Sequence, residues 1–212
     1  SLQKILILIS KITKNHQRSP DLFKRINCLF SYLEKHITKS FTNDEIFKIF
    51  KNNKLLLLSL FEKKIITIDE NITKSILQKK KQKYPLYFYT EIKPFLNEDE
   101  QTEYENELLY VNPKIFDTFD HKRQQGDNDS IICETIRNDA IEDFVSYVNR
   151  FSISLNQKVK PSLFETNSFL LKSEPTIIEY SAFYGSIQII KYLQYNSIDL
   201  KESLWLYSIH GK

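Results

Sequence analysis

Apolar side chains recur every three or four residues along the first part of the chain, which is the spacing of one face of an α-helix. In residues 21–39 this face consists of Leu22, Ile26, Leu29, Phe30, Leu33 and Ile37. Residues 2–12 and 54–64 are apolar at most positions, so we expect a core helix in the first and a helix buried nearly all round in the second. The pattern predicts an all-α N-terminal region of short helices.

Polar residues indicate where these helices begin. Threonine or serine followed three residues later by glutamate forms a capping box, in which the two side chains satisfy backbone N–H groups of the first turn. Thr42–Glu45 predicts a helix from residue 45 to 51, and Thr67–Glu70 predicts one that continues to about residue 81. Ser162–Glu165 has the same pattern and predicts a short helix near residues 163–169.

The clearest pattern lies in residues 176–200, which predict two short antiparallel helices. Thr176 and Glu179 form a capping box for the first helix. Gly185 can adopt the left-handed conformation that ends one helix and turns into the next. Apolar residues resume after it, with Ile187, Ile190 and Leu193 on one face.

The same spacing returns twice elsewhere. Leu204–Gly211 repeats the spacing of Ile178–Gly185, and the two glycines, 185 and 211, are 26 residues apart. Ser130–Val148 contains a weaker copy, in which Asp139 takes the place of the turn glycine. A period of this kind predicts a stack of helix-turn-helix units, an α-solenoid.

These residues resemble an ankyrin repeat. Nine positions agree with the family pattern in register: Thr176, Ile178, Ala182, Gly185, Ile187, Ile189, Ile190, Leu193 and Asp199. Four positions depart from it, namely Ile177, Glu179, Ser181 and Ser197, where the family has proline, histidine, alanine and glycine. The glycine spacing is shorter than the roughly 33 residues of the family, which predicts a shortened hairpin between units. The amino-acid sequence of the C-terminal stretch resembles that of divergent protist ankyrin-like proteins, in which a helical N-terminal region precedes the repeats.

The predicted organisation is a helical N-terminal domain over residues 1–120, which caps the stack, and ankyrin-like units over residues 121–212. The polar stretch at residues 121–129 is expected to form a loop where the two parts meet. Complete units are expected at about 128–149 and 174–200, with an inserted segment at 151–172. Residues 201–212 begin a third unit, and the sequence contains no methionine. We therefore expect a C-terminally truncated fragment.

Composition changes this picture little. The net charge of +3 is too small to imply a nucleic-acid partner, and only three glycines in 212 residues disfavour a β-sandwich. Cys28 and Cys133 have no ligand spacing, so we expect reduced thiols in a cytoplasmic protein, with a nuclear location left open by the basic run Lys79–Lys83. The apolar run near the N-terminus is shorter than the roughly 20 residues of a membrane span, so no membrane partner is expected.

We find no motif that indicates catalysis. None of the four histidines has a partner at metal-ligand spacing, and the scattered glycines form no phosphate-binding loop. No G-x-S-x-G sequence is present. The prediction is a protein that is not an enzyme, with no metal, no cofactor and no small-molecule substrate.

The predicted function is protein–protein interaction through the ridge of the repeats. The resemblance places partner contacts at the two positions before each turn: Phe183, Tyr184, Ile209, His210, Arg137 and Asn138. It gives Gly185 and Gly211 a structural role in the turns. In a second interpretation, Phe183 and Tyr184 pack against Phe169 or Leu170 instead, and Ile209 covers a following repeat.

An alternative function is binding of nucleic acid or another acidic surface. Lys79–Lys83 would supply the charge, and the adjacent Tyr84, Tyr87, Phe88 and Tyr89 would stack on bases. This hypothesis predicts binding that weakens steeply with salt. Against it, the lysines suit the C-terminal end of a solvated helix, and the aromatic rings suit packing.

Overall fold

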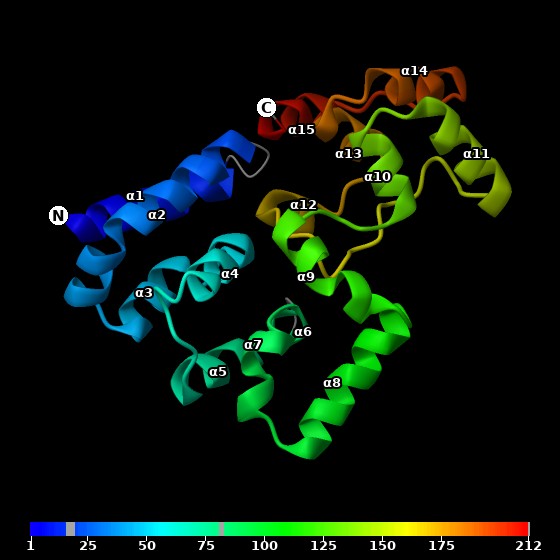
Figure 1. Ribbon diagram of the computed structural model, residues 1–212. Helices are drawn as coiled ribbons and strands as arrows, with labels where there is room; N and C mark the ends of the chain where they lie inside the picture. The colour runs from blue at the N-terminus through cyan, green and yellow to red at the C-terminus, as the bar shows by residue number, and fades with distance from the viewer. Residues whose placement is uncertain (16–19, 81–82, 212) are drawn as a thin grey trace. The chain divides into compact units, whose positions relative to one another are not determined.

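A computed structural model describes residues 1–15, 20–80 and 83–211 (Figure 1). Within these residues the protein is all-α, and the one β-type contact is an isolated bridge between Lys158 and Thr176. The chain divides into two compact units, with the boundary between Gly126 and Asp127. No helix in the described part of the chain is both long enough and apolar enough to span a membrane.

The first unit contains nine α-helices among the residues described. They are α1 (Leu2–Asn15), α2 (Pro20–Ser40), α3 (Asn43–Phe50), α4 (Lys54–Glu62), α5 (Glu70–Leu77), α6 (Tyr84–Tyr87), α7 (Tyr89–Ile92), α8 (Glu98–Val111) and α9 (Ile115–Gln125). A short 3-10 helix, Lys93–Phe95, follows α7. Helix α4 has buried residues around most of its circumference, as its run of leucines predicts.

Aromatic side chains fill much of the interior of the first unit. Phe30 and Phe50 meet edge to face with 5.7 Å between ring centroids, and Phe61 meets Phe88 in the same way at 5.6 Å. Helices α6 and α7 form the aromatic-rich segment from Tyr84 to Ile92, in which Tyr87 and Phe88 are fully buried. This aromatic-rich segment is therefore part of the core.

Arg123 of α9 is a buried cation in the first unit. Its side chain is 3% exposed, and Nη1 lies 2.6 Å from a carboxylate oxygen of Glu91. Nη1 also donates to the carbonyl oxygen of Tyr87 at 2.9 Å, and the Tyr87 hydroxyl donates to the carbonyl oxygen of Arg123 at 2.8 Å. The guanidinium thus joins α9 to α6 and α7.

The second unit contains six α-helices in the residues described. They are α10 (Ile131–Arg137), α11 (Ile141–Phe151), α12 (Ser168–Ser173), α13 (Ile177–Tyr184), α14 (Ile187–Tyr195) and α15 (Ser203–His210). Helix α10 packs against α11, and α13 packs against α14; α13 also contacts both α10 and α15, and α11 contacts α14. Two helical pairs therefore lie against each other, with α15 on the far side of α13.

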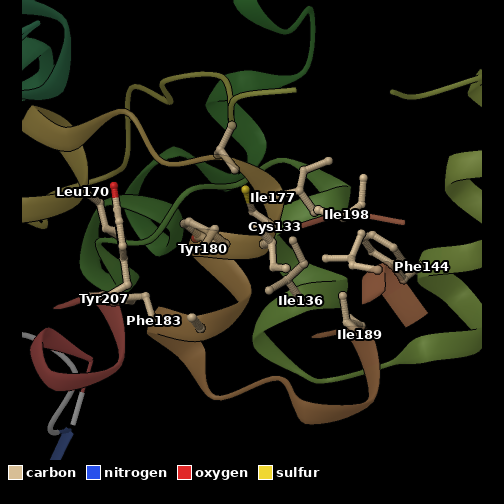
Figure 2. Close-up of a cluster of buried hydrophobic side chains, with 14 of the residues drawn as sticks. Cys133, Ile136, Phe144, Leu170, Ile177, Tyr180, Phe183, Ile189, Ile198 and Tyr207 are labelled. Carbon is tan, nitrogen blue, oxygen red and sulfur yellow. The ribbon is translucent and has the colours of Figure 1, made fainter. Parts of the chain in front are cut away.

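One continuous cluster of buried side chains holds the second unit together (Figure 2). Ile136, Phe144 and Ile189 lie at the end formed by α10, α11 and α14. Phe183 and Tyr207 lie at the end formed by α13 and α15. The two helical pairs share this core, so neither has a complete core of its own.

Several predicted helix signals are confirmed. Thr42 begins α3 with a capping box, and at the start of α13 the backbone N–H of Thr176 donates to Glu179 at 2.8 Å. Gly185 has φ +71° in the turn between α13 and α14. Gly211 differs, because its φ of −87° continues the right-handed conformation of α15.

Three local predictions were wrong. Helix α5 is capped by Asp69 and ends at Leu77, because the Asp69 carboxylate accepts from the N–H of Ile72 at 2.9 Å and takes the role expected of Thr67. Ser162–Glu165 is not helical, and the inserted helix is α12, capped by Asn167. The polar stretch expected to form a loop after residue 120 is instead the end of α9, which carries the buried Arg123.

Candidate interaction surface

The turns of the second unit link one helical pair to the next. Asp139, between α10 and α11, has φ +49°, and its carboxylate accepts hydrogen bonds from the backbone N–H groups of Gln188 and Ile189, each at 3.1 Å. Ser186, between α13 and α14, donates its hydroxyl to the carbonyl oxygen of Ile136. Each turn thus satisfies a backbone group of the other pair.

Replacing Asp139 by alanine is expected to destabilise the second unit by about 1 kcal/mol, because two N–H groups at the start of α14 lose their acceptor. Alanine also tolerates a positive φ less well than aspartate. Urea unfolding followed by the fluorescence of Trp205, the one tryptophan, measures the loss. Asp139→Asn keeps one acceptor oxygen and is expected to lose less; an equal loss in the two variants would refute the capping role.

Phe183 does not present a surface to a partner. Its side chain is 1% exposed and stacks on Phe169 with 6.2 Å between ring centroids. Tyr184 is half-buried, and its hydroxyl donates to Asp127 at 3.2 Å. Phe183 therefore packs against Phe169, as the second interpretation predicted. The inserted segment makes this contact possible, because Phe169 belongs to its helix α12.

Arg137 is also engaged inside the unit. Its Nη1 donates to the carbonyl oxygen of Asn128 at 2.6 Å, and its Nε lies 3.8 Å from a carboxylate oxygen of Asp127. The guanidinium therefore holds the segment before α10 against the end of that helix. Asn138, the next residue, is exposed.

Ile209 and His210, on α15, are both exposed. Ile209 is 61% exposed, whereas the imidazole of His210 stacks on Phe169 with 4.1 Å between ring centroids. Of the six predicted contact residues, Asn138, Ile209 and His210 are thus open to solvent.

The residues of α10 and α11 that face away from α13 and α14 form a groove of about 490 Å³. Its apolar lining includes Ile131 and Phe151, which are 55% and 56% exposed, together with Tyr147. Its charged and polar lining includes Glu134, Asn138, Asp143 and Arg150. Asn138 is the one predicted contact residue that lines this groove. The other groove residues were not predicted. The sequence feature that could have indicated them is the apolar side chains of Ile131 and Phe151 on the outer side of a helical pair.

The alternative surface in the first unit has a different arrangement. Tyr84, Tyr87, Phe88 and Tyr89 are all buried, with Tyr89 the most exposed at 3%, so these rings offer no face to a nucleotide base. Lys79 donates to the carbonyl oxygen of Lys51 and lies 4.3 Å from the centroid of the Tyr84 ring. Burial lowers the pKa of Lys79 to about 8, with a further contribution from the charge of Lys51. Lys81 lies outside the described residues.

No group of three or more histidine, cysteine, aspartate or glutamate side chains in the described ranges is arranged to hold a metal ion. No protein-family model matches the chain, no curated protein matches it, and no solved structure matches it.

Proposed function

We propose that the second unit is a protein-binding module of stacked ankyrin-like helical pairs, and that it holds a segment of a partner protein in the groove between α10 and α11. Three features support this proposal. The sequence of residues 176–211 resembles the ankyrin pattern, two helical pairs share one core, and their turns are joined by hydrogen bonds. In such an architecture the outer faces of the helical pairs are available to a partner, and the module binds rather than catalyses.

The observation that carries the proposal is the exposure of large apolar side chains beside charges of mainly one sign. Ile131 and Phe151 are more than half exposed, and both line the groove together with Tyr147, so exposed apolar side chains gather at this one place. Glu134 and Asp143 place two carboxylates in the same lining, against the single guanidinium of Arg150. This chemistry fits a peptide segment with an apolar side chain flanked by lysine or arginine.

A peptide library displayed on phage and selected against the full chain tests this. The expected consensus is an apolar residue next to a basic one. Phe151→Ser is expected to weaken a selected peptide at least about tenfold, because an exposed aromatic anchor typically contributes more than 1 kcal/mol to binding. Asp143→Lys is expected to lower the binding affinity of each peptide in proportion to the peptide's basic charge.

Ile187→Ser is the matched control, because Ile187 is 55% exposed on α14, as Ile131 is on α10, and lies outside the groove. It is expected to leave peptide affinity unchanged, while Ile131→Ser reduces it. The proposal fails if selected peptides lack basic residues, or if Ile131→Ser and Ile187→Ser have equal effects. Capture of nucleic acid that salt releases would favour the alternative surface instead.

A further inference from the structure

Glu165 is a buried carboxyl in the second unit that neither the turns nor the groove requires. It lies in the irregular segment Ile153–Asn167, between α11 and α12, and is 4% exposed. One of its oxygens, Oε1, accepts from the backbone N–H of Asn167 at 2.7 Å. The other, Oε2, is buried and has no hydrogen-bond partner among the protein atoms described. A buried carboxylate with an oxygen that accepts no hydrogen bond is costly, and the protonated acid costs far less.

The groups that face Glu165 come from every element packed around it. Asp127, before α10, contributes a negative charge, and Arg137 on α10 contributes a positive one. Cys133 on α10 and Tyr180 and Tyr184 on α13 complete the surroundings. Burial raises the pKa of the Cys133 thiol to about 11 and that of both phenols above their usual range, so these three groups stay neutral at pH values where Glu165 titrates.

Two more ionisable residues line a cavity of about 20 Å³ that Glu165 shares with Asn128 and Tyr180. Lys160 is exposed, and Glu174 forms an exposed ion pair with Lys158 at 2.9 Å. A cavity of this size is large enough to admit one water molecule. Arg137 is already engaged by Asn128 and by Asp127, so its charge is shared with a second carboxylate.

Hydrogen bonds join the segment that carries Glu165 to the start of α13 and to the residues before α10. The N–H of Val159 donates to the carbonyl oxygen of Pro175 at 2.8 Å, and the N–H of Ile177 donates to that of Gln157 at 3.1 Å. The side chain of Asn128 donates to the carbonyl oxygen of Lys160 at 2.8 Å. The Ser162 hydroxyl donates to Asp129 at 2.7 Å, and Leu163 and Phe164 are buried. The segment has no regular secondary structure, so its opening breaks these contacts without unwinding a helix.

We propose that Ile153–Asn167 is a proton-operated latch, closed over the core of the second unit when the Glu165 carboxyl carries a proton and released as that proton is lost. Loss of the proton leaves a buried negative charge beside Asp127, and local opening hydrates it. The latch is a property of this unit and does not depend on what the groove binds.

The direction of the pH dependence follows from proton binding. Burial raises the pKa of Glu165 to about 8 in the closed state, whereas an exposed glutamate has its ordinary pKa of about 4.3. Between these two values the closed state binds more protons than the open state. The closed state is therefore favoured at low pH. The ratio of closed to open molecules falls by up to about tenfold for each unit of rising pH and becomes constant above about pH 8.

Amide hydrogen exchange of the full chain, corrected for intrinsic rates, measures this opening. Protection of the amides of Val159 and Asn167 is expected to fall as pH rises from 5 to 8, by up to about tenfold per unit. Amides within α14 serve as the internal control and are expected to show no such trend. Loss of protection in α14 together with the segment would mean general unfolding and would overturn the latch.

Two variants separate the latch from other causes. Glu165→Gln keeps the shape of the neutral acid, so the protection of the Val159 and Asn167 amides in this variant is expected to be independent of pH. A fall in protection with pH as steep as in the unaltered protein would overturn the proposal. Asp127→Asn removes the neighbouring negative charge and is expected to move the upper end of the transition to lower pH. A transition that stays in place in that variant would show that the two carboxyls are not coupled.

Discussion

Replacing Arg123 by alanine is expected to destabilise the first unit by about 3–5 kcal/mol. The change leaves Glu91, whose side chain is 17% exposed, without its cation, and removes the donor to the carbonyl oxygen of Tyr87. Loss of hydrogen-exchange protection in α6, α7 and α9, read as a difference in opening free energy, measures the effect.

Lys93→Ala is the matched control. Lys93 and Glu105 also form an ion pair, at 2.8 Å, but their side chains are 47% and 39% exposed, so the expected loss is below about 1 kcal/mol. Arg123→Lys keeps the charge but cannot donate to Tyr87, Glu91 and Asp120 in the same planar geometry, and most of the loss is expected to remain. A loss from Arg123→Ala no larger than that from Lys93→Ala would contradict the structural role of the guanidinium.

Replacing Phe183 by alanine is expected to destabilise the second unit by about 3–5 kcal/mol, through lost apolar burial and the cavity left beside Phe169. Urea unfolding followed by Trp205 fluorescence measures the change. Trp205 lies on α15, which packs directly against α13, so its signal reports on this unit.

Ile209→Ala is the control, because Ile209 holds the position in α15 that Phe183 holds in α13 and is 61% exposed. Its expected effect on stability is within about 0.5 kcal/mol. Equal losses in the two variants would mean that Phe183 contributes no more to the core than a surface residue does. The contrast also decides which residues are suitable for binding experiments, since a change at Phe183 alters the fold itself.

The sequence predicted the all-α class and the main turns of the second unit because those features depend on neighbouring residues. A capping box needs only Thr176 and Glu179, and a left-handed turn needs only Gly185. The wrong helix starts arose where two polar residues competed for one helix end. Asp69 took the place of Thr67, and Asn167 capped α12 while Glu165 turned inward.

The features that the sequence pattern missed depend on residues far apart in the chain. Phe183 is buried because Phe169, from an inserted segment with no clear period, stacks on it. Arg123 lies in a stretch so polar that it resembled a loop. Its partners Glu91 and Tyr87 are 32 and 36 positions earlier in the chain, so only tertiary packing brings them together. The groove was missed for the same reason: its apolar residues belong to the helical face that the rest of the second unit leaves uncovered.

The most direct test of the proposed function is chemical-shift mapping of the full chain with a peptide selected from the displayed library. Backbone amide signals of Ile131, Asn138, Tyr147 and Phe151 are expected to shift in a saturable manner, because these residues line the groove. Signals of α14 and of the first unit are expected to stay in place. Shifts centred on Ile209 and His210, or on α6 and α7, with no change in α10 and α11, would contradict the account.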